Sequence, residues 1–371
     1  DDARRRAEAN TNQLVRIQAI HTNLARADAD ATNAFLVGGL EPAAQRADYT
    51  RSLTQASQLI AEAARAQTAD GPALGALNSS VLSYASLVEQ ARATNRQALP
   101  VGAQYLRLAS SGLRSEALPI LDALVKANEA RVSAEFDNAR AESVPLIAAG
   151  VLALLILIGG MVWLSWRTHR YINAPLAAAT AAILVTLVVG AIALSAVGSR
   201  VSQVRDGSYA ATLATATARI AAFDAKSNES LTLIARGSGS AFEKAWMASS
   251  KVVTDESATA ARLSSDATKM GGLWRTYVNT HTQIRKADDG GQWEAAVSQA
   301  TGTAATSANA TFNAFDSSSA AALTSSSASA SGSLDGPRTW LPFAAWLGLL
   351  IGLAAAVSAW WGVSLRLEEY R

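Results

Sequence analysis

Residues 175–197 read PLAAATAAILVTLVVGAIALSAV, a run of 23 residues without Asp, Glu, Lys or Arg. Residues 144–166 and 340–363 form two further uncharged runs of 23 and 24 residues. At a rise of about 1.5 Å per residue, each run is long enough to cross a hydrocarbon core of about 30 Å. The sequence therefore predicts an integral membrane protein with three transmembrane helices.

The segments between these runs differ in length and charge, and this difference predicts a topology. Residues 167–174 form a short basic loop and residues 364–371 a short tail, whereas residues 1–143 and 198–339 are long and near neutral. Short basic loops stay in the cytoplasm, and long domains cross largely regardless of charge. We therefore expect a multi-pass protein of the cell (plasma) membrane with both long segments extracytoplasmic. This orientation requires a further transmembrane helix before Asp1, although Arg4, Arg5 and Arg6 argue against it.

The two long segments show helical periodicity. In the first, apolar residues recur at alternating steps of three and four along Leu74, Leu77, Val81, Tyr84, Val88 and Ala91. Similar seams run through residues 49–63 and 118–136, and such seams are typical of helices packed in a bundle. Turn residues then divide the segment into helices near 3–37, 42–69, 73–98 and 113–143, with a short helix near 101–109. The last helix is expected to continue into the membrane.

The second long segment repeats motifs of the first. Tyr84, Gln90 and Arg92 recur in the same order and spacing at residues 277, 283 and 285. Such self-similarity favours a tandem duplication. The fold class predicted is thus an all-α membrane protein with two tandem extracytoplasmic four-helix bundles joined to transmembrane helices. The Ser- and Ala-rich residues 317–333 are compatible with a flexible linker, but we expect a helix there.

Motifs that carry chemistry are lacking. The chain has no cysteine, only three histidines, and none of the phosphate-binding, dinucleotide-binding or zinc-protease motifs. His21 and His281 fit bundle cores better than ligand sites. The net charge of +2 does not suggest nucleic-acid binding, and the uncharged spans do not suggest ion transport. We expect no enzyme activity, no metal, no cofactor and no nucleic-acid partner.

Polar residues near the bundle seams and in the turns are the candidates for binding a ligand or partner. Buried charges need partners, so these residues are expected to form internal ion pairs, lie on a solvated face, or bind a ligand. The candidates are Asp28, Asp30, Asn33, Glu41, Asp224, Asn228, Glu229, Arg236, Asp288, Asp289 and Trp293. The candidates for cytoplasmic signalling are Arg167, His169, Arg170, Tyr171, Arg366, Glu368, Glu369, Tyr370 and Arg371.

Two resemblances follow from these features. The arrangement of long and short helices resembles the four-helix-bundle sensor domain of bacterial chemoreceptors. Residues 27–42, 224–239 and 277–293 resemble the GlnX family of actinobacterial membrane proteins, and the resemblance extends over essentially the whole chain. That family is implied to connect an amino-acid-binding lipoprotein, GlnH, to the cytoplasmic Ser/Thr protein kinase G, and so to adjust glutamate metabolism.

Three functions therefore remain open. The first is a transmembrane signal relay between an extracytoplasmic amino-acid-binding lipoprotein and a cytoplasmic Ser/Thr kinase. The second is a receptor of the chemoreceptor type that binds an amino acid directly, and the third is a structural envelope scaffold. Gly348 and Gly352 would let two helices approach closely, so a homodimer is also compatible with the sequence.

Overall fold

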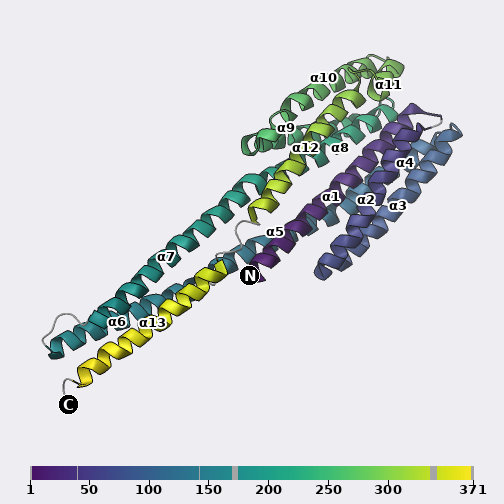
Figure 1. Ribbon diagram of the computed structural model, residues 1–371. Coiled ribbons are helices and arrows are strands. Elements are labelled where there is room, and N and C mark those ends of the chain that lie inside the picture. The colour runs from purple at the N-terminus through teal and green to yellow at the C-terminus, as the bar shows by residue number, and fades with distance from the viewer. Residues whose placement is uncertain (1, 40, 142, 169–173, 335–340, 369–371) are drawn as a thin grey trace. The chain divides into compact units, whose positions relative to one another are not determined.

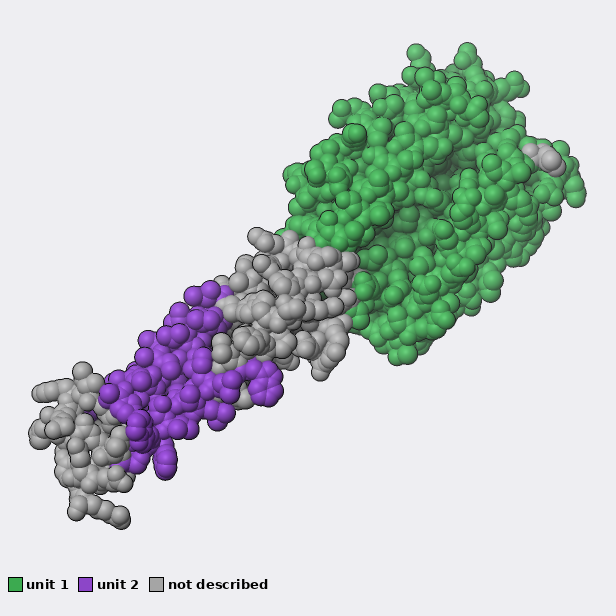
Figure 2. All heavy atoms as spheres, in the orientation of Figure 1, with its two compact units in different colours: residues 1–133, 205–330 green, residues 134–204, 331–371 purple. Residues whose placement is uncertain are grey.

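The computed structural model describes residues 2–39, 41–141, 143–168, 174–334 and 341–368 (Figure 1). In these residues every regular element is helical, which confirms the all-α fold class. The chain divides into two units (Figure 2), of which the first comprises residues 1–133 and 205–330 and the second comprises residues 134–204 and 331–371. The first unit holds the residues that the sequence predicts to bind a ligand or partner, and the second holds the cytoplasmic candidates.

The first unit contains two groups of helices. The first group consists of α1 (Asp2–Val37), α2 (Ala43–Ala66), α3 (Gly71–Arg96), α4 (Val101–Gly112) and α5 (Leu118–Ala141), with the short turns η1 (Thr68–Asp70) and η2 (Leu113–Ala117). The second group consists of α8 (Ala210–Ile234), α9 (Ser240–Leu263), α10 (Met270–Asp289), α11 (Trp293–Thr301) and α12 (Ala308–Leu334), with the turns η3 (Arg205–Tyr209) and η4 (Ser265–Ala267).

The core of the first group lies where the apolar periodicity predicts it. All six residues of the predicted α3 seam, from Leu74 to Ala91, are buried. On α2, Tyr49, Ala56, Ile60 and Ala63 are buried as expected. The prediction for residues 118–136 is only partly correct, because the buried stripe of α5 follows Leu121, Leu124 and Asn128 while Leu118 and Val125 are half-buried.

The sequence predicts a break between the short helix near 101–109 and the helix that begins near 113, at Ser110-Ser111-Gly112, and this prediction is wrong. The chain stays helical there, and α4, the π-helical turn η2 and α5 follow one another directly. The π-helical turn adds a residue to the local repeat and leaves Leu113 and Ala117 facing the core. Burial of these two side chains thus outweighs the weak helix-breaking tendency of a single glycine. The expected break at Gly38-Gly39 is confirmed, since both glycines have positive φ.

The core of the second group is rich in aromatic residues. Tyr277 and Trp274 of α10 pack against Phe312 and Phe315 of α12, with ring centroids 5.2–5.4 Å apart. The Ser- and Ala-rich stretch belongs to α12, which confirms the expectation of a helix and excludes a flexible linker over residues 317–333.

Helices α1 and α8 join the two groups side by side. Arg26 lies over the ring of Phe223 at 4.8 Å, and Asp28 accepts a hydrogen bond from Ser227. Near the helix ends, Leu36 belongs to the core of the second group and Ile234 packs against the core of the first. The two helices therefore run parallel, and the loops that follow them lie at the same end of the first unit (Figure 1).

The second unit consists of α6 (Ser143–Thr168), α7 (Ala174–Val204) and α13 (Leu341–Glu368). Helices α6 and α7 meet closely at Gly150, where an added Cβ would clash with the side chain of Leu187. Within the described residues, one segment, Ala174–Ile192, is long and apolar enough to cross a membrane. The apolar segment Ile147–Trp163 is shorter. The third predicted span, residues 340–363, includes residues outside those described.

Candidate functional site

The boundary between the two groups of helices contains a buried polar cluster centred on Arg114. Arg114 of η2 donates from Nε to Asp224 Oδ1 at 2.9 Å, and its Nη2 lies 3.2 Å from Asp28 Oδ2. Asp28 also accepts hydrogen bonds from Ser110 at 2.5 Å and from Ser227 at 2.6 Å. Burial lowers the pKa of Arg114, but the two carboxylates outweigh this effect and raise it. The cluster therefore contains residues of both groups of helices.

A second charged cluster lies at the same boundary, with the signs reversed. Asp316 of α12 pairs with Arg219 of α8 at 2.8 Å and with Arg26 of α1 at 2.9 Å. Arg219 also donates to the Asp316 carbonyl and to Ser319. In the first cluster, Arg114, just before α5, forms ion pairs with both α1 and α8. In the second, Asp316 of α12 forms ion pairs with the same two helices. Because a buried charge is costly unless it is paired, these contacts fix the register of α1 against α8.

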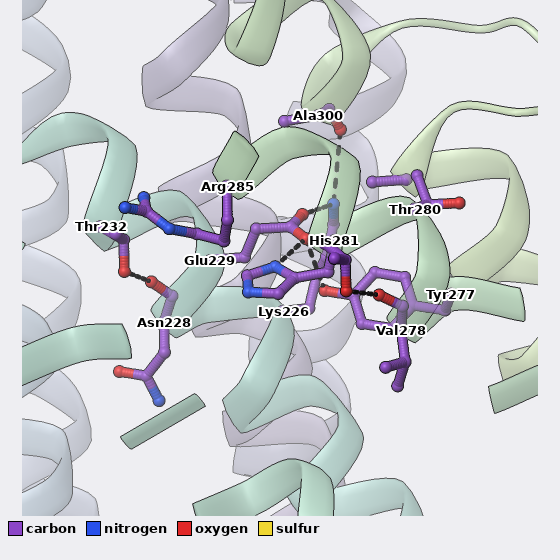
Figure 3. A network of polar contacts seen from close by, with 12 residues as sticks. Lys226, Asn228, Glu229, Thr232, Tyr277, Val278, Thr280, His281, Arg285 and Ala300 are labelled. Atoms are coloured by element: carbon purple, nitrogen blue, oxygen red, sulfur yellow. Dashed lines mark hydrogen bonds and ion pairs between the residues drawn. The ribbon is translucent and has the colours of Figure 1, made fainter. Parts of the chain in front are cut away.

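The second group contains a third polar cluster in its own core (Figure 3). Glu229 accepts from Lys226 at 2.7 Å, from Tyr277 at 3.0 Å, and lies 2.8 Å from His281 Nδ1. The other nitrogen of His281 lies 3.3 Å from Glu243, and its ring stacks on Trp246.

The pKa values in this third cluster follow from burial and charge. Burial alone would raise the pKa of Glu229, but Lys226 and His281 outweigh it and lower the pKa to about 2. Burial alone would lower the pKa of His281, but its bonds to Glu229 and Glu243 raise it. The two carboxylates therefore favour the protonated imidazole inside the core.

The structure distributes the predicted site residues over several places. Asp28 and Asp224 meet at Arg114, and Asn228 donates to Asp224 at 3.0 Å. Glu229 lies in the core cluster, and Asp30 and Asn33 line a cleft between the groups.

The candidates in the turns form contacts at the helix ends. Glu41 pairs with Arg92 at 2.9 Å. Arg236 lies over the ring of Trp293 at 3.9 Å, and Trp293 donates to the Leu233 carbonyl. Asp288 and Asp289 both pair with Arg285.

The cytoplasmic candidates fall largely outside the structure. His169, Arg170, Tyr171, Glu369, Tyr370 and Arg371 lie outside the described residues. Arg167, Arg366 and Glu368 belong to helices, but their side chains are not described.

Sequence reasoning missed Arg114, the partner of Asp28 and Asp224, and the pairs that Arg26 and Arg219 form with Asp316. Two signals point to them in the sequence. Arg114 directly follows Leu113, which belongs to the core stripe, and a buried carboxylate requires a cation nearby. The positions of these residues along the sequence do not predict which cation pairs with which acid. Among the residues that the structure describes, no group of His, Cys, Asp or Glu is arranged to hold a metal ion.

The cleft between the groups is lined by α1, α2, α8 and α12 and has a volume of about 240 Å³. Asp30, Asn33 and Arg26 of α1, Gln45 and Asp48 of α2, and Asn309, Asn313 and Asp316 of α12 supply its polar side chains. Phe223 and Phe312 supply its aromatic wall. The cleft can therefore take a small polar molecule with an apolar part.

Comparison with known proteins gives a family match within the first group of helices. Residues 3–137 match the family model of an actinobacterial sensor domain. No curated protein and no solved structure matches the chain. The matched region extends from the start of α1 into α5, and it includes Asp28, Asp30 and Arg114. The match supports a sensor protein of actinobacteria, with residues 3–137 as a sensor domain.

Proposed function

We propose that the chain is a membrane-anchored sensor that detects an amino-acid-loaded binding lipoprotein and signals to a cytoplasmic Ser/Thr kinase. The observation that carries the proposal is the sensor-domain match over residues 3–137. The apolar segment Ala174–Ile192 is compatible with membrane anchoring. The resemblance of residues 224–239 and 277–293 to the GlnX family supports the choice of lipoprotein and kinase as partners.

The charged clusters suggest how such a sensor would respond. A signal requires two arrangements of similar free energy, of which the partner prefers one. Arg114 and Asp316 each contact both groups of helices, so a shift of α1 against α8 would exchange defined ion pairs rather than deform the core gradually. The lipoprotein, in this proposal, binds the loops after α1 and α8 and favours one register of these helices.

The docking part of the proposal is tested with charge reversals in the loops. Arg236→Glu and Asp289→Lys change side chains at the end of the second group, and Asp289 is 68% exposed. We expect the double variant to weaken lipoprotein binding by about tenfold, because charge complementarity at an interface governs both encounter and register. Binding of the purified full chain in lipid nanodiscs can be measured by surface plasmon resonance. Arg275→Glu, on the exposed face of α10, is the matched control and should bind normally.

Unchanged binding in the double variant would exclude this docking surface. The relay itself is tested separately, by affinity purification of the full chain from actinobacterial membranes. The proposal expects the lipoprotein and the kinase to be purified with it, and it is wrong if neither is recovered while the chain stays folded.

A further inference from the structure

The cleft between α1, α2, α8 and α12 has buried polar atoms around it that the protein does not use. Asp30 Oδ2, Asn33 Nδ2 and Gln45 Oε1 are buried and have no hydrogen-bond partner within the described part of the chain. Asn33 is only 6% exposed. An unpaired buried polar group costs free energy comparable to a lost hydrogen bond. Arg26 Nε is a fourth such atom on the lining, and four of them around one cleft indicate that something else satisfies them.

The charges around the cleft show what that molecule must be. The guanidinium of Arg26 is held by both oxygens of Asp316, at 3.0 and 2.9 Å. The ammonium of Lys226 is held by Glu229 and by the Ala300 carbonyl. Both cations of the cleft wall are therefore already paired, whereas Asp30 has no ion-pair partner among the described residues. Arg26 keeps one donor, Nε, without a hydrogen-bond partner, but its charge is balanced by Asp316. The carboxyl of Asp30 is the charged group of the lining that a ligand could still pair with, and it favours a cationic ligand.

The remaining lining fits the same chemistry. Side-chain amide oxygens accept hydrogen bonds from an ammonium group, and Gln45, Asn309 and Asn313 carry such amides at the cleft. Phe223 and Phe312 are each 4% exposed, and Arg26 already lies over the ring of Phe223. Their exposed edges give the cleft an apolar floor for the methylene groups of the ligand. Both rings belong to the second group of helices, whereas Asp30 belongs to the first.

We propose that this cleft binds a small organic cation carrying a primary ammonium group, with Asp30 as its counter-ion. The ammonium group pairs with the Asp30 carboxylate, and the amides at the rim accept its remaining hydrogens. The carbon chain of the ligand packs on the aromatic wall. The bound molecule contacts both groups of helices, so it stabilises the register in which α1 and α8 close the cleft. This site is an input separate from the lipoprotein, and its failure would leave the relay proposal untouched.

Protonation of Asp30 makes the binding depend on pH. Burial raises the pKa of Asp30 to about 7, opposed by Arg26 and assisted by Asp48 and Asp316. The charged side chains that face it are Arg26, Asp48, Arg51, Lys226 and Asp316. At pH 6 the carboxyl of the empty cleft is mostly protonated and must release its proton before it can pair with an ammonium group. We therefore expect affinity to rise between pH 6 and pH 8.

The test is isothermal titration calorimetry of the full chain in lipid nanodiscs with putrescine, cadaverine and L-lysine. We expect at least one of these amines to bind at pH 8, while L-glutamate gives no heat. Asp30→Asn should weaken the binding by about tenfold or more, because it removes a charged hydrogen-bond partner. Asp255→Asn, on the surface of α9, is the matched control and should leave it unchanged.

Two further measurements distinguish binding from folding. Thermal unfolding of Asp30→Asn without ligand should occur at the same or a higher temperature than in the wild type, because the substitution removes a buried carboxyl that has no ion-pair partner. Asn313→Trp fills the cleft from an exposed position of α12 and should also abolish the binding. The proposal is overturned if none of the three amines binds, if glutamate binds equally well, or if both variants bind as tightly as the wild type.

Discussion

Glu229 connects three buried polar side chains in the core of the second group. Its carboxylate satisfies Lys226, Tyr277 and His281, all of which are buried. Glu229→Gln removes the charge and leaves the Lys226 ammonium unpaired in the core. We expect the free energy of unfolding to fall by about 3–5 kcal/mol. Chemical denaturation measures this loss, and Asp255→Asn, which breaks an exposed pair with Lys251, should cost less than about 1 kcal/mol.

The raised pKa of His281 also predicts how the free energy of unfolding depends on pH. Its pKa is raised in the folded protein, so the folded state binds more protons than the unfolded state above about pH 6.5. The contribution of His281 is therefore complete below pH 6.5 and is lost as the pH rises through its folded pKa. We expect the stability difference between the wild type and His281→Gln to shrink from pH 6 to pH 9, as measured by denaturation at each pH.

Taking the difference between the wild type and His281→Gln cancels the pH dependence that Asp30 contributes to stability, because both proteins retain Asp30. The raised pKa of Asp30 also lowers stability as the pH rises, over the range from about 4 to 7. A stability difference that grows with pH would contradict the assignment of His281 as a core cation.

At the scale of elements, the packing of α4 on α3 depends on a glycine. A Cβ added at Gly102 would lie 2.8 Å from Thr94 Oγ1 and 3.2 Å from the Ala91 carbonyl oxygen. Gly102→Ala should therefore destabilise the protein by about 1–3 kcal/mol, because the backbone of α3 must move. Gly75→Ala in the open face of α3 is the control, since its Cβ would meet no described atom within 4 Å.

The control variant is expected to change the free energy of unfolding in the opposite direction. Alanine restricts the unfolded chain more than glycine and favours a helix, so Gly75→Ala should stabilise by about 0.5–1 kcal/mol. Differential scanning calorimetry of the two variants measures both effects, and equal shifts in both would show that helices α3 and α4 do not touch at Gly102.

At the scale of the whole first unit, Arg114 holds the two groups of helices together. Removing it leaves Asp28, which is 2% exposed, beside Asp224 without a cation. We expect Arg114→Ala to cost about 3–5 kcal/mol and to increase amide hydrogen exchange along α1 and α8. Arg275→Ala on the exposed face of α10 should leave exchange in both helices unchanged. Exchange that rises only within η2 would show that Arg114 stabilises its own turn and not the boundary.

Much of the helical architecture follows from periodicity. The α3 seam is buried at every predicted position because steps of three and four place those side chains on one stripe, whichever helix packs against them. The continuity of the helix through residues 110–112 was not predictable from local signals, since the cost of one glycine is smaller than the gain from burying Leu113 and Ala117.

The sequence alone determined that the chain is helical, where its apolar stripes lie and which acids are candidates for burial, because these properties depend on neighbours a few residues apart. Only the tertiary structure decided that Arg114 lies between Asp28 and Asp224, that Asp316 holds Arg26, and that Asp30 faces a cleft. These contacts join residues far apart in the chain, and they depend on the register of α1 against α8, which is set by the simultaneous pairing of several buried charges and by no local pattern.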